Sequence, residues 1–127
     1  MLKSIVTALA VLAFSTGMAL ASEFTKFDPA TFAEAQKSGK SIVIHVHADW
    51  CPTCKAQVGP LKTLAASPDF KNVVAMTIDY DGQAEARKML NITKQSTIIA
   101  FKGSTETARA TGVTNAEAIE KLARSAL

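Results

Sequence analysis

The chain has 127 residues, of which 48% are hydrophobic and 20% charged, and its formal net charge is +3 at pH 7. This length suits one compact domain with a hydrophobic core and is short for two. Lysine and arginine only slightly outnumber the acidic residues, 14 to 11, and are scattered along the chain. The composition therefore gives no support to a nucleic-acid partner or to an anionic membrane surface. No internal repeat, low-complexity tract or linker divides the sequence.

Residues 1–21 have the pattern of a secretory signal peptide. Lys3 gives a positive start, residues 5–14 are mostly apolar, and Ala19-Leu20-Ala21 is a small-x-small cleavage site. The apolar run is short for a retained membrane anchor. We therefore expect cleavage after Ala21, which leaves residues 22–127 as one domain without stable membrane insertion, in an oxidising compartment outside the cytoplasm.

The rest of the chain alternates strand and helix patterns. The expected elements in chain order are strand 24–27, helix 30–38, strand 41–47, helix 51–67, strand 72–79, helix 82–90, strands 97–102 and 105–111, and a last helix that begins at 114. Asp28-Pro29 and Gly39 mark the two ends of the first helix, and Pro60 is expected to bend the second. The order predicts an α/β fold, in which about four helices flank a central mixed sheet of four to five strands.

The only two cysteines, Cys51 and Cys54, lie where strand 41–47 gives way to a helix. Unpaired N–H groups and the helix dipole at a helix start favour a thiolate, which predicts Cys51 as an accessible nucleophile. Cys54 follows one turn later on the same face, deeper in the protein, as the resolving thiol. Pro52 suits this first turn because a proline there costs no intrahelical hydrogen bond. The pattern favours redox chemistry.

Three other interpretations of the cysteine pair compete with this one. A purely structural disulfide is a weak interpretation, because a bridge across so short a loop removes little unfolded-state entropy. A zinc knuckle normally takes a second ligand pair, which the sequence lacks. His45 and His47 precede the cysteines, however, so a metal-binding or metal-delivery protein stays open, with His47 as a further ligand. A catalytically idle interaction module is the third alternative.

The likeness to a known family rests on three features. They are a hydrophobic strand followed by Trp50-Cys51-Pro52-Thr53-Cys54-Lys55, an α/β order that ends in a hairpin and a helix, and the run Ser-Thr-Ile-Ile-Ala-Phe-Lys-Gly at 96–103. Residues 24–127 thereby resemble a thioredoxin. The Cys-Pro-Thr-Cys segment is similar to that of thioredoxin-like reductases of cytochrome c maturation. The approach at 47–51, His-Ala-Asp-Trp-Cys, resembles the carboxy-terminal domain of the periplasmic disulfide-interchange transporter.

The resemblance implies a thiol–disulfide oxidoreductase that reduces protein disulfides in the bacterial periplasm and uses no cofactor. A membrane thiol–disulfide transporter would supply the electrons, since the chain has no nucleotide or flavin fingerprint. By the same resemblance Cys51 is the nucleophile, Cys54 resolves the mixed disulfide, and the substrate is bound by Trp50, Pro52, Thr53 and Ser96. Potentials of Cys-x-x-Cys proteins span about −270 to −120 mV, so the direction of electron flow is left open.

Two positions depart from the family pattern. His45 stands where thioredoxins carry a buried acid, and we expect it to act as a neutral imidazole base for the resolving thiol or, alternatively, as a polar core residue. Ser96 stands where thioredoxins have a cis-proline. We therefore expect a trans Gln95–Ser96 peptide and a free N–H or hydroxyl that could donate to a thiolate or a substrate carbonyl. By family analogy, loss of the proline also removes a barrier to metal capture, which would make Ser96 a further ligand.

Overall fold

The computed structural model describes residues 22–127, so the expected signal peptide lies outside the described residues and stays a prediction. The elements are β1 (Thr25–Lys26), α1 (Pro29–Lys37), β2 (Ser41–His47), α2 (Pro52–Ala65), β3 (Val74–Asp79), α3 (Ala84–Met89), β4 (Thr97–Lys102), β5 (Thr105–Thr111) and α4 (Ala116–Arg124). Their types and order confirm the sequence-based prediction. A short 3₁₀ helix at Pro68–Phe70, which was not predicted, comes after α2.

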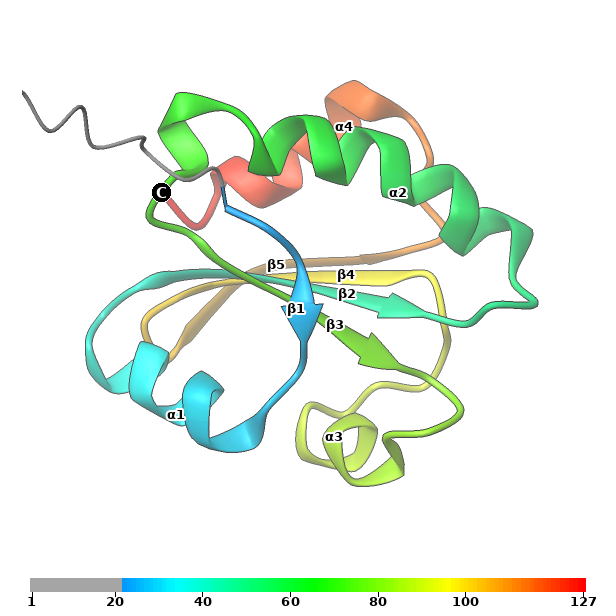
Figure 1. Ribbon diagram of the computed structural model, residues 1–127, viewed down its shortest axis with the longest axis horizontal. Helices are drawn as coiled ribbons and strands as arrows, with labels where there is room; N and C mark the ends of the chain where they lie inside the picture. The colour runs from blue at the N-terminus through cyan, green and yellow to red at the C-terminus, as the bar shows by residue number, and fades with distance from the viewer. Residues whose placement is uncertain (1–21) are drawn as a thin grey trace, which may run out of the picture.

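One mixed sheet has the strand order β1-β3-β2-β4-β5. Strands β1 and β2 run parallel to β3, whereas β4 runs antiparallel to both β2 and β5. Helices α2 and α4 cover one face of this sheet, and α1 and α3 cover the other (Figure 1). The arrangement confirms the predicted α/β class. Across residues 22–127 no helix has the length and apolar character needed to cross a membrane.

The central strand β2 is buried on both faces, which explains its nearly continuous apolar sequence. Ile42, Ile44 and Val46 belong to the hydrophobic core under α1 and α3. Val43 belongs to the second core, under α2 and α4. Because side chains alternate along a strand, His45 lies on the same face as Val43, toward α2.

The helix ends are explained by local chemistry. Asp28 caps α1 by accepting the Thr31 N–H at 2.8 Å, Pro29 occupies its first turn, and Gly39 comes after it with a φ of 70°. Helix α2 begins at Pro52, ends two residues earlier than expected, and continues across Pro60. The bend expected at Pro60 stays a prediction.

Candidate active site

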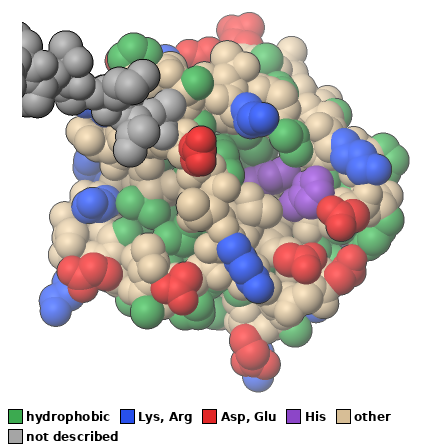
Figure 2. Space-filling view, in the orientation of Figure 1, with side chains coloured by type: hydrophobic (Ala, Val, Ile, Leu, Met, Phe, Trp, Pro, Cys, Tyr) green, Lys and Arg blue, Asp and Glu red, His purple; other side chains and the backbone are tan. Residues whose placement is uncertain are grey.

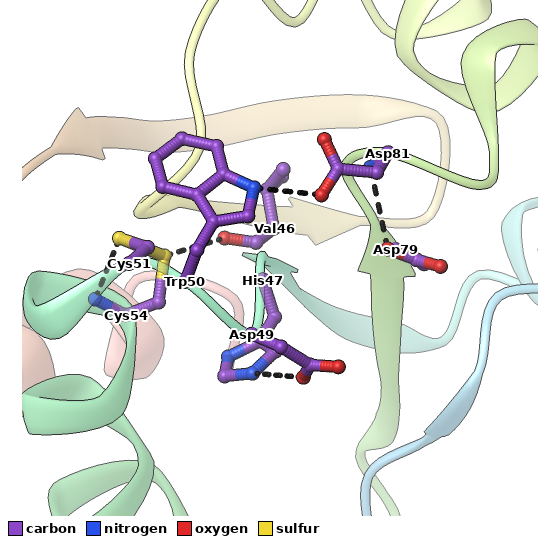
Figure 3. Close-up of polar contacts among 8 residues, drawn as sticks. All are labelled: Val46, His47, Asp49, Trp50, Cys51, Cys54, Asp79 and Asp81. Carbon is purple, nitrogen blue, oxygen red and sulfur yellow. Dashed lines mark hydrogen bonds and ion pairs between the residues drawn. A yellow bond between two sulfur atoms is a disulfide. The ribbon is translucent and has the colours of Figure 1, made fainter.

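The two cysteines lie at the junction of β2 and α2 and are joined by a disulfide bond, with their Cα atoms 5.3 Å apart. Cys51 is the N-cap of α2, and its Sγ accepts the backbone N–H of Cys54 at 3.0 Å (Figure 3). Its own N–H donates to the Ala48 carbonyl at 3.1 Å. When the pair is reduced, the same N–H and the start of the helix dipole are placed to stabilise a thiolate on Cys51.

The prediction of an accessible Cys51 is wrong for this disulfide-bonded state. Cys51 is only 2% exposed and Cys54 is fully buried, in a small cluster with Ala48, against which Tyr80 packs. The bond to Cys54 and the packing with Ala48 and Tyr80 leave Cys51 little exposed surface. Cys54 is the deeper of the two, as expected.

Trp50 is an exposed shoulder beside the disulfide, with 58% of its surface accessible. Its indole N–H donates to Asp81 Oδ2 at 2.7 Å, and its ring meets Tyr80 edge to face at 6.5 Å (Figure 3). Asp81 is held in turn by its N–H, which donates to Asp79 Oδ1 at 3.2 Å. Pro52 is also exposed and Thr53 half-buried. A flat apolar surface is thus held in a fixed orientation next to the sulfurs.

Tyr80 and Asp81 were missed from the sequence. They come after the end of β3, and β3 runs parallel to β2 with His47 opposite Asp79. Parallel strands end at the same edge of a sheet, so residues after β3 lie beside residues after β2. The available signal was the polar and aromatic cluster at 79–81 directly after a buried strand.

His45 is 3% exposed and its Nε2 lies 3.0 Å from Gln57 Oε1. Burial lowers the pKa of His45 to about 4; the hydrogen bond with Gln57 opposes this shift, and the nearby His47 adds to it. The imidazole is therefore neutral at pH 7, as expected. Among the described residues no hydrogen bond joins His45 to Cys51 or Cys54.

Gln57 is a second residue that the sequence analysis missed. It is fully buried, and its Nε2 donates to the carbonyls of Ser96 at 2.9 Å and Val113 at 2.8 Å. The available signal was a polar residue one turn after Cys54, on the side of α2 that packs against the sheet. Gln57 links the helix of the cysteines to the loops before β4 and after β5.

His47 lies on the same face as His45, with the two ring centroids 5.5 Å apart. Its Nε2 is 3.3 Å from Asp49 Oδ1, and its buried Nδ1 has no partner among the described residues. Figure 2 shows histidine atoms at the surface next to acidic side chains. Within residues 22–127, however, no three histidine, cysteine or acidic side chains come together as a metal site. The metal-binding interpretation gains no support from this geometry.

Ser96 confirms one expectation and contradicts another. No peptide bond between the described residues is cis, so Gln95–Ser96 is trans as predicted. The Ser96 N–H is not free for substrate, because it donates to the Val46 carbonyl at 2.9 Å. The Ser96 carbonyl is also used, since it accepts from Gly112 N–H at 2.9 Å as well as from Gln57. These bonds hold Ser96 at a φ of 57°, a left-handed conformation uncommon for serine.

The loop at Ser96 and the disulfide meet at one backbone carbonyl. Val46 O accepts the Ser96 N–H and also lies 3.7 Å from Cys54 Sγ. The structure therefore brings Cys51, Cys54, Trp50 and Ser96 together at one edge of the sheet, with His45 beneath α2.

Comparisons with known proteins agree with this geometry. The family model described as thioredoxin matches residues 23–125. The chain belongs to the thioredoxin family. Accordingly, this thioredoxin-family protein is a thiol–disulfide oxidoreductase, and Cys51 and Cys54 are its only cysteines.

Individual relatives cover most of the described chain. A thioredoxin of Chlamydia muridarum is 28% identical over 91 residues, which are 72% of this chain and 86% of that protein. The crystal structure of Trxlp from Edwardsiella tarda is 32% identical, with a TM-score of 0.75, over 79% of this chain and 98% of that one. The thioredoxin of Malassezia sympodialis, at 18% identity and a TM-score of 0.72, shares the fold over 81% of this chain and 90% of its own.

Proposed function

We propose that this thioredoxin-family protein reduces disulfide bonds of other proteins in the bacterial periplasm. The observation that carries the proposal is a disulfide at the N-cap of α2, next to an exposed and rigidly held Trp50. A peptide segment can lie against that indole with its own disulfide beside Cys51. The signal-peptide pattern at residues 1–21 supports the location.

The reaction begins from the dithiol form. The Cys51 thiolate attacks one sulfur of the substrate disulfide, which breaks that bond, forms a mixed disulfide and releases a substrate thiolate that takes up a proton. Deprotonated Cys54 then attacks Cys51 Sγ and displaces the second substrate thiolate. The product is the Cys51–Cys54 bond seen in the structure. Two electrons have passed from the dithiol to the substrate.

His45 is the proposed acceptor of the Cys54 proton. It lies beneath the cysteine helix and is a neutral base at pH 7, since burial lowers its pKa to about 4. With a pKa of about 4, His45 is a weak base. His45 therefore holds the proton only transiently, while the thiolate reacts.

Return to the dithiol needs an external electron donor. A membrane thiol–disulfide transporter is the proposed donor. Its thiol pair would reduce the Cys51–Cys54 disulfide by the same exchange reaction, with Cys51–Cys54 now the disulfide that is attacked. No cofactor enters this scheme.

Insulin reduction with dithiothreitol as the final reductant tests the activity. The wild type should accelerate precipitation of the insulin B chain, and Cys51→Ser should not, because the serine hydroxyl is a far weaker nucleophile. Equal rates of insulin reduction for the two proteins would show that the chain is an interaction module without catalytic activity. Fractionation of cells that express the full chain tests the location, with a periplasmic product beginning at Ser22 expected.

A separate measurement addresses the metal alternative. Protein purified under reducing conditions should carry no stoichiometric metal ion, as measured by elemental analysis. One bound ion per chain, lost in Cys51→Ser, would replace the proposed reductase with a metal-binding protein.

A further inference from the structure

The buried Gln57 takes no part in the exchange steps described above, but its contacts indicate a separate role. All three of its polar contacts are made inside the protein, to His45 Nε2, to the Ser96 carbonyl and to the Val113 carbonyl, at 3.0, 2.9 and 2.8 Å. A fully buried amide with every contact satisfied is held in one orientation, since losing any of them leaves a polar group unpaired.

The two carbonyls decide which end of the amide faces His45. Carbonyl oxygens only accept hydrogen bonds, so the atom that faces Ser96 O and Val113 O must be the NH₂ group, which has two hydrogens to donate. The opposite orientation would place the amide oxygen against two other oxygens. Gln57 therefore presents its oxygen, an acceptor without hydrogens, to His45.

The tautomer of His45 is determined by that orientation. A ring nitrogen that faces an obligate acceptor must carry the hydrogen, so His45 Nε2 is protonated. In a neutral imidazole the lone pair then lies on Nδ1.

We propose that Gln57 is a positioning residue that fixes His45 in its Nε2–H tautomer and so makes Nδ1 the base for the resolving cysteine. This inference rests on the proposed function. In the resolving step the Cys54 thiol proton moves to Nδ1, while the Nε2–H bond to Gln57 is kept. The Cys54 thiolate forms a bond to Cys51 Sγ, the mixed disulfide breaks, and the departing substrate thiolate takes up the proton as Nδ1 releases it.

The first test is spectroscopic and needs no change at Gln57. Long-range proton–nitrogen correlation spectra of protein labelled with ¹⁵N-histidine distinguish a bare ring nitrogen from a protonated one. The chain has two histidines, so His47→Gln leaves His45 as the only imidazole and assigns its signals. A single Nε2–H form at pH 7 is expected. An Nδ1–H form, or a mixture of the two, would overturn the inference.

The second test separates the two chemical steps. When the reduced protein reacts with 5,5′-dithiobis(2-nitrobenzoate), attack by Cys51 releases one thionitrobenzoate, and attack by Cys54 on the mixed disulfide releases the second. Gln57→Met keeps the size of the side chain and removes its hydrogen bonds. We expect the second release to slow by about tenfold or more, the first to stay unchanged, and the single tautomer to be lost.

Leu61→Met is the matched control, because Leu61 is also buried on α2, one turn later, and makes no polar contact. It should leave both release rates and the His45 spectrum as in the wild type. A Gln57→Met protein with the wild-type tautomer or the wild-type second rate would contradict the positioning role. Insulin reduction by the wild type decides the proposed function separately, since the spectrum of His45 is measured without any substrate.

Discussion

At the scale of single residues, the surroundings determine the charge state of one residue at the site, His45, and the backbone conformation of another, Ser96. His45 is a histidine buried under a helix, and burial keeps it neutral although the hydrogen bond with Gln57 favours the protonated form. Ser96 is a serine in the left-handed region, held there by an N–H bond to Val46 O and two bonds to its own carbonyl. Burial sets the charge state of His45, and the surrounding hydrogen bonds hold the backbone of Ser96 in its uncommon conformation.

His45 makes the stability of the protein depend on pH. Between about pH 6.5, the pKa of an unfolded histidine, and about 4, the unfolded chain binds this proton and the folded protein does not. The contribution of His45 to the free energy of unfolding is therefore complete above pH 6.5. It falls as the pH decreases toward 4, by about 3 kcal/mol in total. His45→Asn should flatten this part of the dependence, measured by urea unfolding across pH 4–7. Equal slopes for the two proteins would show that His45 titrates normally.

The backbone geometry of Ser96 predicts how replacing it with the family's proline would change stability. Proline fixes φ near −65°, whereas Ser96 has a φ of 57°, and proline also lacks the N–H that donates to Val46 O. Ser96→Pro should lower the free energy of unfolding by about 3 kcal/mol. Ser96→Gly is the control and should stay near the wild type, because glycine adopts positive φ freely. The free energies of unfolding of the three proteins are measured by chemical denaturation. Equal values for Ser96→Pro and Ser96→Gly would contradict this account.

At the scale of elements, α1 and α2 begin with the same device and use it differently. Each has an N-cap side chain that accepts an N–H three residues on, and a proline in the first turn. In α1 the acceptor is the Asp28 carboxylate, which serves only to start the helix. In α2 it is the Cys51 sulfur, so the cap is also the reactive atom.

Because of this difference, removing the cap of α1 is expected to affect stability and not activity. Asp28 accepts from both the N–H and the hydroxyl of Thr31, and α1 lies on the face of the sheet opposite α2 (Figure 1). Asp28→Ala should lower the thermal midpoint, because the N-cap acceptor is lost, and leave insulin reduction unchanged. Asp28→Asn keeps an acceptor and should lower the midpoint less. A fall in reductase rate at a temperature where Asp28→Ala is folded would show that α1 influences the site.

At the scale of the whole molecule, two hydrophobic cores lie on the two faces of one sheet, and the cysteines belong to neither. The disulfide packs with Ala48 and Tyr80 at the edge of the sheet. The fold should therefore persist when the disulfide is opened, as a protein that cycles between dithiol and disulfide requires.

Reduction should accordingly lower stability only modestly. A loop closed between positions 51 and 54 contributes about 2 kcal/mol in the chain-entropy account, against about 4.7 kcal/mol for a loop of roughly 100 residues. Far-ultraviolet circular dichroism should be unchanged by dithiothreitol at 25 °C, with a lower but still cooperative thermal transition. A Cys51→Ser/Cys54→Ser double variant should show no response to dithiothreitol. Loss of the cooperative transition on reduction would contradict this expectation.

The sequence by itself determined the fold class, the element order and the reactive pair. These features are local: the apolar run at 41–47, the Asp28-Pro29 cap and the Cys-x-x-Cys spacing each act through near neighbours in the chain. Helix α2 ended two residues early, and the 3₁₀ turn at 68–70 went unpredicted, because a proline indicates where a helix stops but not the conformation of the residues after it.

Only the tertiary structure decided how the site is assembled. Asp81 reaches Trp50 across 31 positions, and Gln57 joins His45, Ser96 and Val113 from three separate segments. Strand pairing and helix packing create these contacts, so no local pattern carries them. The same holds for the burial of Cys51 and for the Ser96 N–H, whose partner lies on β2. The sequence specified which groups could react, and the packed fold determined which atoms they face.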